Sequence, residues 1–261
     1  MNEVTPFTDG EAAMFLRMVT HIIRAEDSEK NARTYAGSVL SGLRTTDGCV
    51  FAALLQESSN PQRCISLTIW SARDASVAYE ESGLYQKLVD SLRPYFLETD
   101  EWKLELSEDL SLQYTPVRVE PSVEGFDETL VASGSLAGLK RNPFAVHILA
   151  VSVLEEHVGN FEKILASEIY NRYRHIKGFL ELVTVRQQRT FFVISFWDET
   201  VDLQSSSGVH SLDRLGESVS AMLPSFIQWK ATHKHEAQLS ASSEDVKASV
   251  YRCLTAEWFA R

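Results

Sequence analysis

The sequence repeats one ordered set of landmarks, and this repeat limits the folds open to the chain more than any other feature. Each set has a glycine before a strand-like run, a tryptophan at the end of the next run, and a proline that closes a helical stretch. The two sets are Gly48, Trp70 and Pro94, and Gly178, Trp197 and Pro224. The two glycines are as far apart as the two prolines. A repeat of this length indicates duplicated domains, because solenoid repeats are much shorter.

Each half of the chain shows the same order of expected elements: a strand, a helix, a hairpin of two strands, a helical return and a last strand. In the first half, a helix begins near Ser28 and keeps its apolar residues on one face. The hairpin covers 49–70, and residues 102–114 alternate as a final strand or strand pair would. In the second half, the hairpin covers 179–197 and the last strand is expected at 226–235. The order βαββαβ predicts an α+β fold in which each half is a ferredoxin-like module, with helices on one face of an antiparallel sheet.

These elements set the expected domain boundaries. Module 1 is predicted to cover residues 14–114, and module 2 is predicted to cover residues 144–238. Residues 115–143 contain several Pro and Gly residues and are predicted to form a linker. Residues 239–261 are predicted to form a C-terminal helix, because apolar residues recur at every fourth position from Val246 to Trp258.

The composition argues against several classes of partner. The net charge is −11, from 36 acidic and 25 basic residues. Nucleic acid and anionic membrane surfaces both require clustered Lys and Arg, so neither is expected as a partner. The N-terminus lacks the pattern of a secretory signal, and no apolar run is long enough to cross a bilayer. Cys49, Cys64 and Cys253 lack metal-ligand spacing and are expected to be reduced thiols, which favours a cytoplasmic protein.

The residues around Trp70 resemble a known family. A strand at 65–71 that contains Trp70, a helix at 75–79 and the segment 82–85 resemble the antibiotic-biosynthesis monooxygenase (ABM) family of the dimeric α+β barrel superfamily. Residues 192–197 carry a fainter likeness in module 2. The resemblance implies oxygen chemistry on aromatic, polyketide-like substrates without metal or flavin, or haem degradation.

The resemblance also implies how the two modules are arranged. Members of this family usually form homodimers in which two sheets face each other and close a barrel. Two modules in one chain therefore imply an intramolecular pseudo-dimeric α+β barrel. Apolar residues on both sides of the strands agree with this arrangement, because sheet-on-sheet packing buries the face that the helices leave open. A small aromatic molecule is the expected ligand, and a homodimer of pseudo-dimers is compatible with the family.

Five residues of module 1 are candidates for a functional site. His21 on the first strand and Tyr79 on the helical return are predicted to be catalytic. His21 would act as a proton shuttle, because the pKa of histidine lies near neutrality. Trp70, Tyr85 and Arg17 are predicted to bind substrate. The structural alternatives are a buried histidine with satisfied hydrogen bonds, a tryptophan that packs in the core, and tyrosines at the edge of the core.

No cofactor is expected, and haem is retained as an alternative. Haem-degrading members of the superfamily place an Asn, a Trp and a His at positions that fall near His21, Tyr79 and Val89 here. Their haem ligand is therefore missing from this chain. If haem binds, His21 or His147 would be the axial ligand.

The sequence thus leaves three functions open. The first is a cofactor-independent monooxygenase that acts on a small aromatic substrate, either a quinol or a polyketide-like molecule. The second is a non-catalytic ligand-binding or interaction protein, and the third is a haem-binding protein. His233 and His235 are two residues apart on an expected strand, but two histidines alone are a weak metal signal, so no metal is predicted.

Overall fold

The computed structural model describes residues 14–106, 112–126, 128–131, 143–165, 167, 170–198 and 246–259. Within them, one antiparallel sheet has nine strands in the order β6-β1-β3-β2-β11-β8-β10-β9-β7, and β4 and β5 form a separate hairpin. Among the described helices, none is long and apolar enough to cross a membrane.

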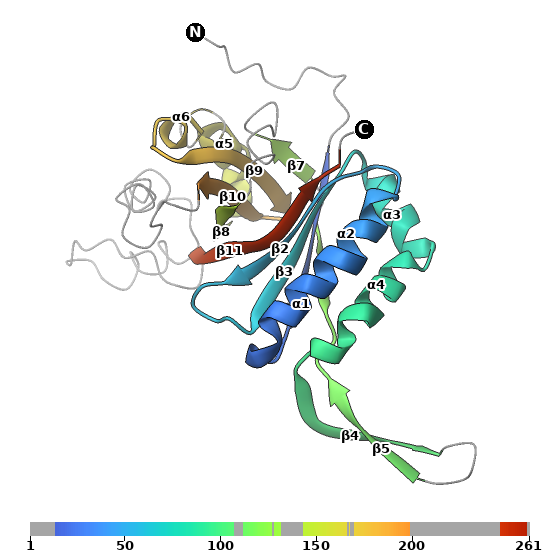
Figure 1. Cartoon of the computed structure of the whole chain (residues 1–261). Coiled ribbons are helices and arrows are strands. Elements are labelled where there is room, and N and C mark those ends of the chain that lie inside the picture. Colours follow the sequence, from blue (N-terminus) through green and yellow to red (C-terminus); the bar gives the residue numbers. More distant parts are fainter. Residues whose placement is uncertain are drawn as a thin grey trace, which may run out of the picture.

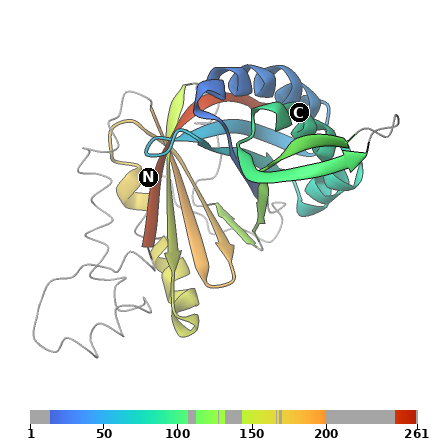
Figure 2. The same cartoon turned by 90° about the horizontal axis from the view of Figure 1, so that it is seen from below.

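Module 1 has the predicted ferredoxin-like order of strands. Its strands are β1 (Phe15–Ile22), β2 (Cys49–Glu57), β3 (Arg63–Trp70) and β6 (Ser122–Gly125). They lie in the order β6-β1-β3-β2. One face is covered by α1 (Ser28–Thr34), α2 (Leu40–Arg44), α3 (Arg73–Glu81) and α4 (Leu84–Leu92) (Figure 1, Figure 2). A π-helical segment, Tyr35–Val39, joins α1 and α2 into one continuous helix.

Module 2 repeats this order. Its hairpin strands lie beside its first strand as in module 1, and β11 flanks β8 as β6 flanks β1. The strands are β8 (Phe144–Ser152), β9 (Phe179–Gln187), β10 (Thr190–Asp198) and β11 (Val246–Trp258). Between β8 and β9 lie α5 (Val158–Ile164) and α6 (Tyr170–Tyr173). The helical return and the last strand predicted at 226–235 lie outside the described residues.

Two stretches of strand belong to both modules and close the sheet into a barrel. The first half of β11 pairs with β8, and its second half pairs with β2. β6 pairs with β1, and the chain then continues as β7 (Glu128–Val131), which pairs with β9. The two ends of the strand order are therefore consecutive in the chain. The fold is the predicted intramolecular pseudo-dimeric α+β barrel.

The interior of the barrel is an apolar core that both modules share. It contains Leu16, Met18 and Phe51 from module 1, and Phe144 and Phe196 from module 2. Two further cores, one in each module, lie between the strands and the helices. Burial of the shared core removes apolar surface of both modules from water, and this holds the modules together.

The fourth strand of module 1 lies outside the region where alternation predicted it. Residues of that region form the hairpin β4 (Glu98–Leu106) and β5 (Leu112–Arg118), which stands away from the barrel (Figure 1). The fourth strand is β6, within the segment predicted as a linker, and β7 follows it there. Alternation shows which residues share a face but not which strand is the neighbour. β6 has 4 residues, too few for a recognisable period.

The predicted C-terminal helix is wrong, because this segment contains β11. Its apolar residues recur at every fourth position: Val246, Val250, Leu254 and Trp258. A spacing of four marks one face of a helix, but it is also an even number and therefore marks one side of a regular strand. The two partner strands β2 and β8, which lie far away in the sequence, decide between these alternatives.

The repeated glycines form the same turn in the two modules. Gly48 has a φ of 78° and Gly178 has a φ of 85°, which glycine adopts without a steric penalty. The Gly48 carbonyl accepts a hydrogen bond from the Ser71 N–H at 2.7 Å, and the Gly178 carbonyl accepts one from the Asp198 N–H at 2.7 Å. At Gly48, an added Cβ would lie 2.4 Å from the Cβ of Ala75. The first landmark of the repeat thus fixes the approach of a helix to a strand.

Candidate functional site

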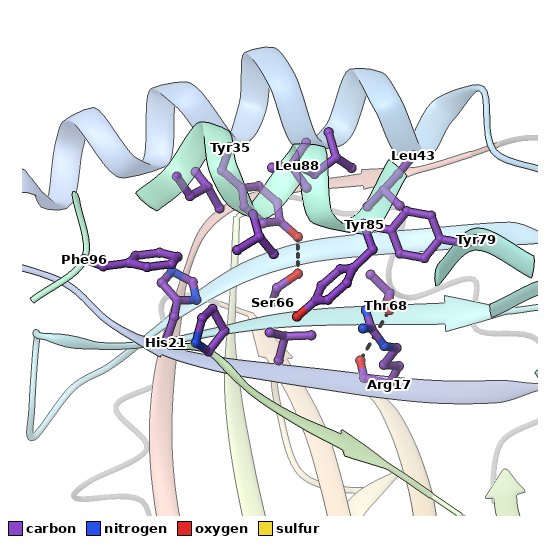
Figure 3. A pocket seen from close by; sticks show the side chains of 15 residues that line it. Arg17, His21, Tyr35, Leu43, Ser66, Thr68, Tyr79, Tyr85, Leu88 and Phe96 are labelled. Carbon is purple, nitrogen blue, oxygen red and sulfur yellow. Dashed lines mark hydrogen bonds between the residues drawn. The ribbon is translucent and has the colours of Figure 1, made fainter. Parts of the chain in front are cut away.

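Module 1 contains a cavity between its sheet and its helices (Figure 3). β1 and β3 form one wall, and the α1–α2 helix and α4 form the other. The polar lining residues are Arg17, His21, Tyr35, Ser66, Thr68, Tyr79 and Tyr85, and the apolar ones are Val19, Val39, Leu43, Leu88, Val89, Leu92, Phe96 and Pro121. Four of the five predicted site residues therefore surround one cavity.

β1 supplies alternate side chains to this cavity. Leu16 and Met18 belong to the core inside the barrel, so Arg17, Val19 and His21 point to the opposite face, toward the helices. The Cα atoms of Arg17 and His21 are about 13 Å apart, because a strand rises about 3.3 Å per residue. The cavity therefore has a guanidinium toward one end, an imidazole toward the other, and apolar residues between them.

His21 is a buried, neutral imidazole. It is 3% exposed, and its ring centroid lies 5.4 Å from that of Phe96. Desolvation lowers its pKa from 6.5 to about 4, and a hydrogen bond to the backbone of Val19 opposes this shift. Within the described part of the chain, Nε2 has no hydrogen-bond partner. The tautomer consistent with the Val19 bond has its proton on Nδ1, which leaves the Nε2 lone pair free to accept a proton.

Arg17 is a buried cation with unsatisfied donors. The residue is 3% exposed, and its guanidinium carbon lies 4.3 Å from the ring centroid of Tyr85 and 5.8 Å from that of Tyr79. Glu80 Oε1 lies 2.9 Å from Arg17 Nε. That contact lacks the direction of a hydrogen bond, since neither Nε nor Nη2 has a hydrogen-bond partner among the described residues. An oxygen ligand could therefore satisfy this edge of the guanidinium.

Tyr79 and Tyr85 cover the same end of the cavity. Their ring centroids are 6.0 Å apart in an edge-on arrangement. Burial raises the pKa of both phenols because it disfavours the phenolate, although the nearby Arg17 charge opposes this effect. Both hydroxyl groups are protonated at neutral pH and can donate hydrogen bonds to a ligand.

Tyr35 and Ser66 form a polar pair that the sequence analysis did not identify. Their hydroxyl oxygens are 2.7 Å apart, and the Tyr35 hydroxyl also donates to the Ala53 carbonyl at 3.3 Å. Ser66 lies between Ile65 and Leu67 on β3. A polar residue that alternates with apolar residues on a strand was the signal that could have identified it. Tyr35 begins the π-helical segment, and such segments occur frequently at functional sites.

Trp70 does not line the cavity. Its ring is fully buried and packs behind Tyr79, with ring centroids 5.1 Å apart. Its Nε1 donates to Thr68 Oγ1 at 2.9 Å, and this hydroxyl donates to the Arg17 carbonyl at 3.3 Å. Tyr79 stands between Trp70 and the cavity, so the structure gives Trp70 a packing role and not the predicted contact with substrate.

Among the described residues, module 2 repeats the tryptophan and only part of the polar lining. Trp197 Nε1 donates to Ser195 Oγ at 2.9 Å, and Ser195 donates to the His147 carbonyl at 3.4 Å. His147 therefore occupies the place that Arg17 has in module 1. It is buried, and desolvation lowers its pKa to about 4. Val151 lies where module 1 has its site histidine.

The size of the cavity limits what it holds in this conformation. Its volume is about 40 Å³, which corresponds to roughly three water molecules. An aromatic ring enters only when wall side chains move, and the half-buried Tyr85 is placed to do so. A haem is far larger and does not fit this cavity. In the part of the chain that is described, no cluster of three or more His, Cys, Asp or Glu residues could hold a metal, and His233 and His235 lie outside it.

Solved structures with the same fold align with both modules of this chain. A provisionally assigned monooxygenase from Lactobacillus acidophilus NCFM has a TM-score of 0.57 and 7% identity, covering 95% of this chain and 97% of its own. Another, from Fusobacterium nucleatum, has a TM-score of 0.55 and 9% identity over 95% of each chain. An anthrone oxidase-like protein has a TM-score of 0.53 and 7% identity, covering 97% of this chain and 95% of its own. No protein-family model and no curated protein matches the sequence.

These comparisons show that the chain shares its fold with these solved structures. The shared architecture covers nearly the whole length of each protein, so it includes both modules and the closure between them. The fold that the resemblance around Trp70 implied is therefore confirmed over both modules.

Proposed function

We propose that this protein is a cofactor-independent monooxygenase that acts on a small aromatic substrate, a quinol or a polyketide-like molecule, in the module 1 cavity. The observation that carries the proposal is a buried cavity with the neutral imidazole of His21 toward one end and the cation of Arg17 toward the other. The hydroxyl groups of Tyr79 and Tyr85 add hydrogen-bond donors. Proteins of the same fold that carry the names monooxygenase and anthrone oxidase-like support this class of chemistry.

For a polyketide-like substrate of the anthrone type, the proposed reaction converts a methylene group between aromatic rings into a carbonyl: R₂CH₂ + O₂ → R₂C=O + H₂O. His21 Nε2 accepts a proton from the substrate, and Arg17 and the tyrosine hydroxyl groups stabilise the resulting anion. The anion transfers one electron to O₂, and the two radicals combine to form a C–O bond. The peroxide takes the proton back from His21, and the hydroperoxide then loses water to leave the carbonyl.

The low pKa of His21 suits this role. A pKa of about 4 belongs to the empty cavity, where burial disfavours the imidazolium. A substrate anion nearby would stabilise the imidazolium and raise this pKa, because opposite charges attract strongly where water is excluded. His21 would therefore hold a proton only while a substrate anion is present.

The experiment is oxygen uptake with a panel of anthrones and naphthohydroquinones, using protein treated with a chelator. We expect uptake above autoxidation and, with the anthrones, incorporation of ¹⁸O from ¹⁸O₂ into the new carbonyl group. His21→Gln should lower kcat by about 100-fold, as expected for loss of a general base. His147→Gln is the matched control, because it changes a buried histidine with a similar pKa in module 2 and should leave kcat unchanged.

The alternatives give different results in the same preparation. Binding of aromatic ligands without oxygen uptake on any substrate would replace the oxygenase by a non-catalytic ligand-binding protein. A Soret shift on titration with hemin that disappears in His21→Gln or His147→Gln would favour the haem-binding protein.

A further inference from the structure

Arg17 and Glu80 form an uneven ion pair. The Arg17 side chain is 4% exposed, whereas the Glu80 side chain is 46% exposed. Burying a guanidinium costs free energy that only a well-aligned partner offsets. Glu80 supplies charge at 2.9 Å from Nε without an aligned hydrogen bond, and Nη2 is also unsatisfied among the described residues. The buried member of the pair therefore lacks the hydrogen bonds that a better placed oxyanion would provide.

The position of Glu80 on its helix makes it easy to displace. It lies in the last turn of α3, next to Glu81. Carbonyl groups at a helix C-terminus carry partial negative charge, so a carboxylate is disfavoured there. Glu80 can rotate into water, where its charge is well solvated, since its side chain is 46% exposed.

Two donors of Arg17, Nε and Nη2, are buried and have no hydrogen-bond partner among the described residues. The face of the guanidinium lies against Tyr85, at 4.3 Å from the ring centroid. Guanidinium donors lie in the plane of the group, and this fork matches the oxygens of a carboxylate or a phenolate. A flat ligand with its oxygen at Arg17 would extend along β1 toward His21, past the apolar side chain of Val19.

We propose that the ligand of the module 1 cavity is an aromatic oxyanion, and that its charged oxygen replaces Glu80 at Arg17. Glu80 is then a placeholder that neutralises Arg17 while the cavity is empty. This inference deepens the proposed function, on which it rests for the choice of cavity, by naming the charge of the substrate and the residue that it displaces.

The test compares two probes of the same shape, 2-naphthoate and its neutral analogue 2-naphthamide, by isothermal titration calorimetry. Neither probe has a reactive methylene group, so binding is measured without turnover. Wild-type protein should bind 2-naphthoate at least about 10-fold more tightly than 2-naphthamide, as expected for a charge-assisted pair. Glu80→Gln removes the competing carboxylate and should tighten binding of 2-naphthoate by up to about 5-fold, with no effect on 2-naphthamide.

Two further variants separate the site from general charge effects. Glu81→Gln makes the same change in charge on the neighbouring exposed residue of α3, and it should leave both affinities unchanged. Arg17→Gln should abolish the preference for 2-naphthoate, and its melting temperature shows whether the variant is folded. If Arg17→Gln does not fold, the contrast between Glu80→Gln and Glu81→Gln decides the question.

The inference is overturned if the two probes bind equally, if neither binds, or if Glu80→Gln weakens binding of 2-naphthoate. Oxygen uptake with an anthrone would still support the proposed function in each of these cases. Conversely, selective binding of 2-naphthoate without oxygen uptake on any substrate would keep the oxyanion site and remove the oxygenase.

Discussion

Module 1 and module 2 share their framework and differ in the lining beneath their helices. The positive-φ glycines and the tryptophan hydrogen bonds are the same in both. Around the cavity, module 1 has Arg17, His21, Tyr35 and Ser66, and the equivalent residues of module 2 are His147, Val151, Leu165 and Val193. The last three of these belong to an apolar core.

This difference shows whether the fold requires the polar residues that line the module 1 cavity. Module 2 builds the same architecture with apolar residues at three of these four places, so the fold does not require polar residues there. Buried polar groups without partners reduce stability. Two such residues of module 1, Arg17 and His21, line one cavity, which supports the ligand site proposed there. The following predictions test that contrast between the modules.

The largest expected effect is on the shared framework. Trp70→Ala and Trp197→Ala should each lower the free energy of unfolding by about 3–5 kcal/mol, because each removes a fully buried ring. Trp70→Phe and Trp197→Phe should cost much less. Urea denaturation measures all four variants. If Trp70→Phe leaves stability unchanged but weakens binding of 2-naphthoate, Trp70 belongs to the site after all, and the modules differ in their framework too.

The next effect is a loss of stability in acid that both modules should show. His21 and His147 have pKa values of about 4 when folded and 6.5 when unfolded. Above pH 6.5 both states are neutral and stability is unaffected. As the pH falls from 6.5 to 4, only the unfolded state binds the proton, so each histidine should lower stability by about 3 kcal/mol, with no further loss below pH 4.

Variants assign this loss to each module. His21→Phe and His147→Phe should each remove about half of the difference in unfolding free energy between pH 7 and pH 4. A saturating aromatic oxyanion should reduce only the part of the acid-induced loss of stability that His21 causes. The reason is that a bound anion raises the pKa of His21. If that ligand reduced the contributions of His21 and His147 to this loss equally, the result would contradict a site confined to module 1.

A smaller effect is expected at the repeated glycine turn. Gly48→Ala should cost about 2 kcal/mol or more, because φ is 78° and the new Cβ would meet Ala75 at 2.4 Å. Gly83→Ala is the matched control. Its φ is 74°, but no atom lies within 4 Å of an added Cβ, so it should cost only about 1 kcal/mol. Thermal unfolding compares the two variants, and equal losses would mean that the helix yields to the new Cβ at Gly48.

The smallest effects should differ in sign between the modules. Tyr35→Phe removes the hydrogen bonds to Ser66 and Ala53 and should destabilise by about 1 kcal/mol. Tyr173 in module 2 has a buried hydroxyl without a hydrogen-bond partner among the described residues. Tyr173→Phe should therefore stabilise the protein by about 1 kcal/mol. Chemical denaturation measures the free energy of unfolding of both variants. Equal decreases in the two variants would contradict the difference in polarity between the modules.

The sequence predicted the elements that local patterns determine. The hairpins and the helix after Ser28 are confirmed, and so is the closed barrel that the family resemblance implied. Arg17, His21, Tyr79 and Tyr85 meet at one cavity because strand alternation and helical spacing, both readable from the sequence, place each on the inner face of its element. The roles of these residues, a cytoplasmic location and the pairing of pseudo-dimers stay predictions.

What the sequence did not predict depends on distant contacts. β6 is recognisable only from its pairing with β1, and β11 is a strand only because it lies between β2 and β8. The pair Tyr35–Ser66 joins a helix to a strand, so neither residue indicates the other in the sequence. Glu80 lies in the predicted helical return, and only the fold brings it to Arg17.

The position of β11 in the sequence also affects how the chain folds during translation. In the sequence it follows every other described strand, yet it pairs with β2, where Trp258 lies opposite Phe51. While the ribosome makes the intervening residues, the edge of β2 has no partner from its own chain. Such an edge can pair with another polypeptide, and contacts across long sequence separations form slowly. Nascent module 1 is therefore at risk of aggregation until β11 emerges, and the two modules reach the native state together.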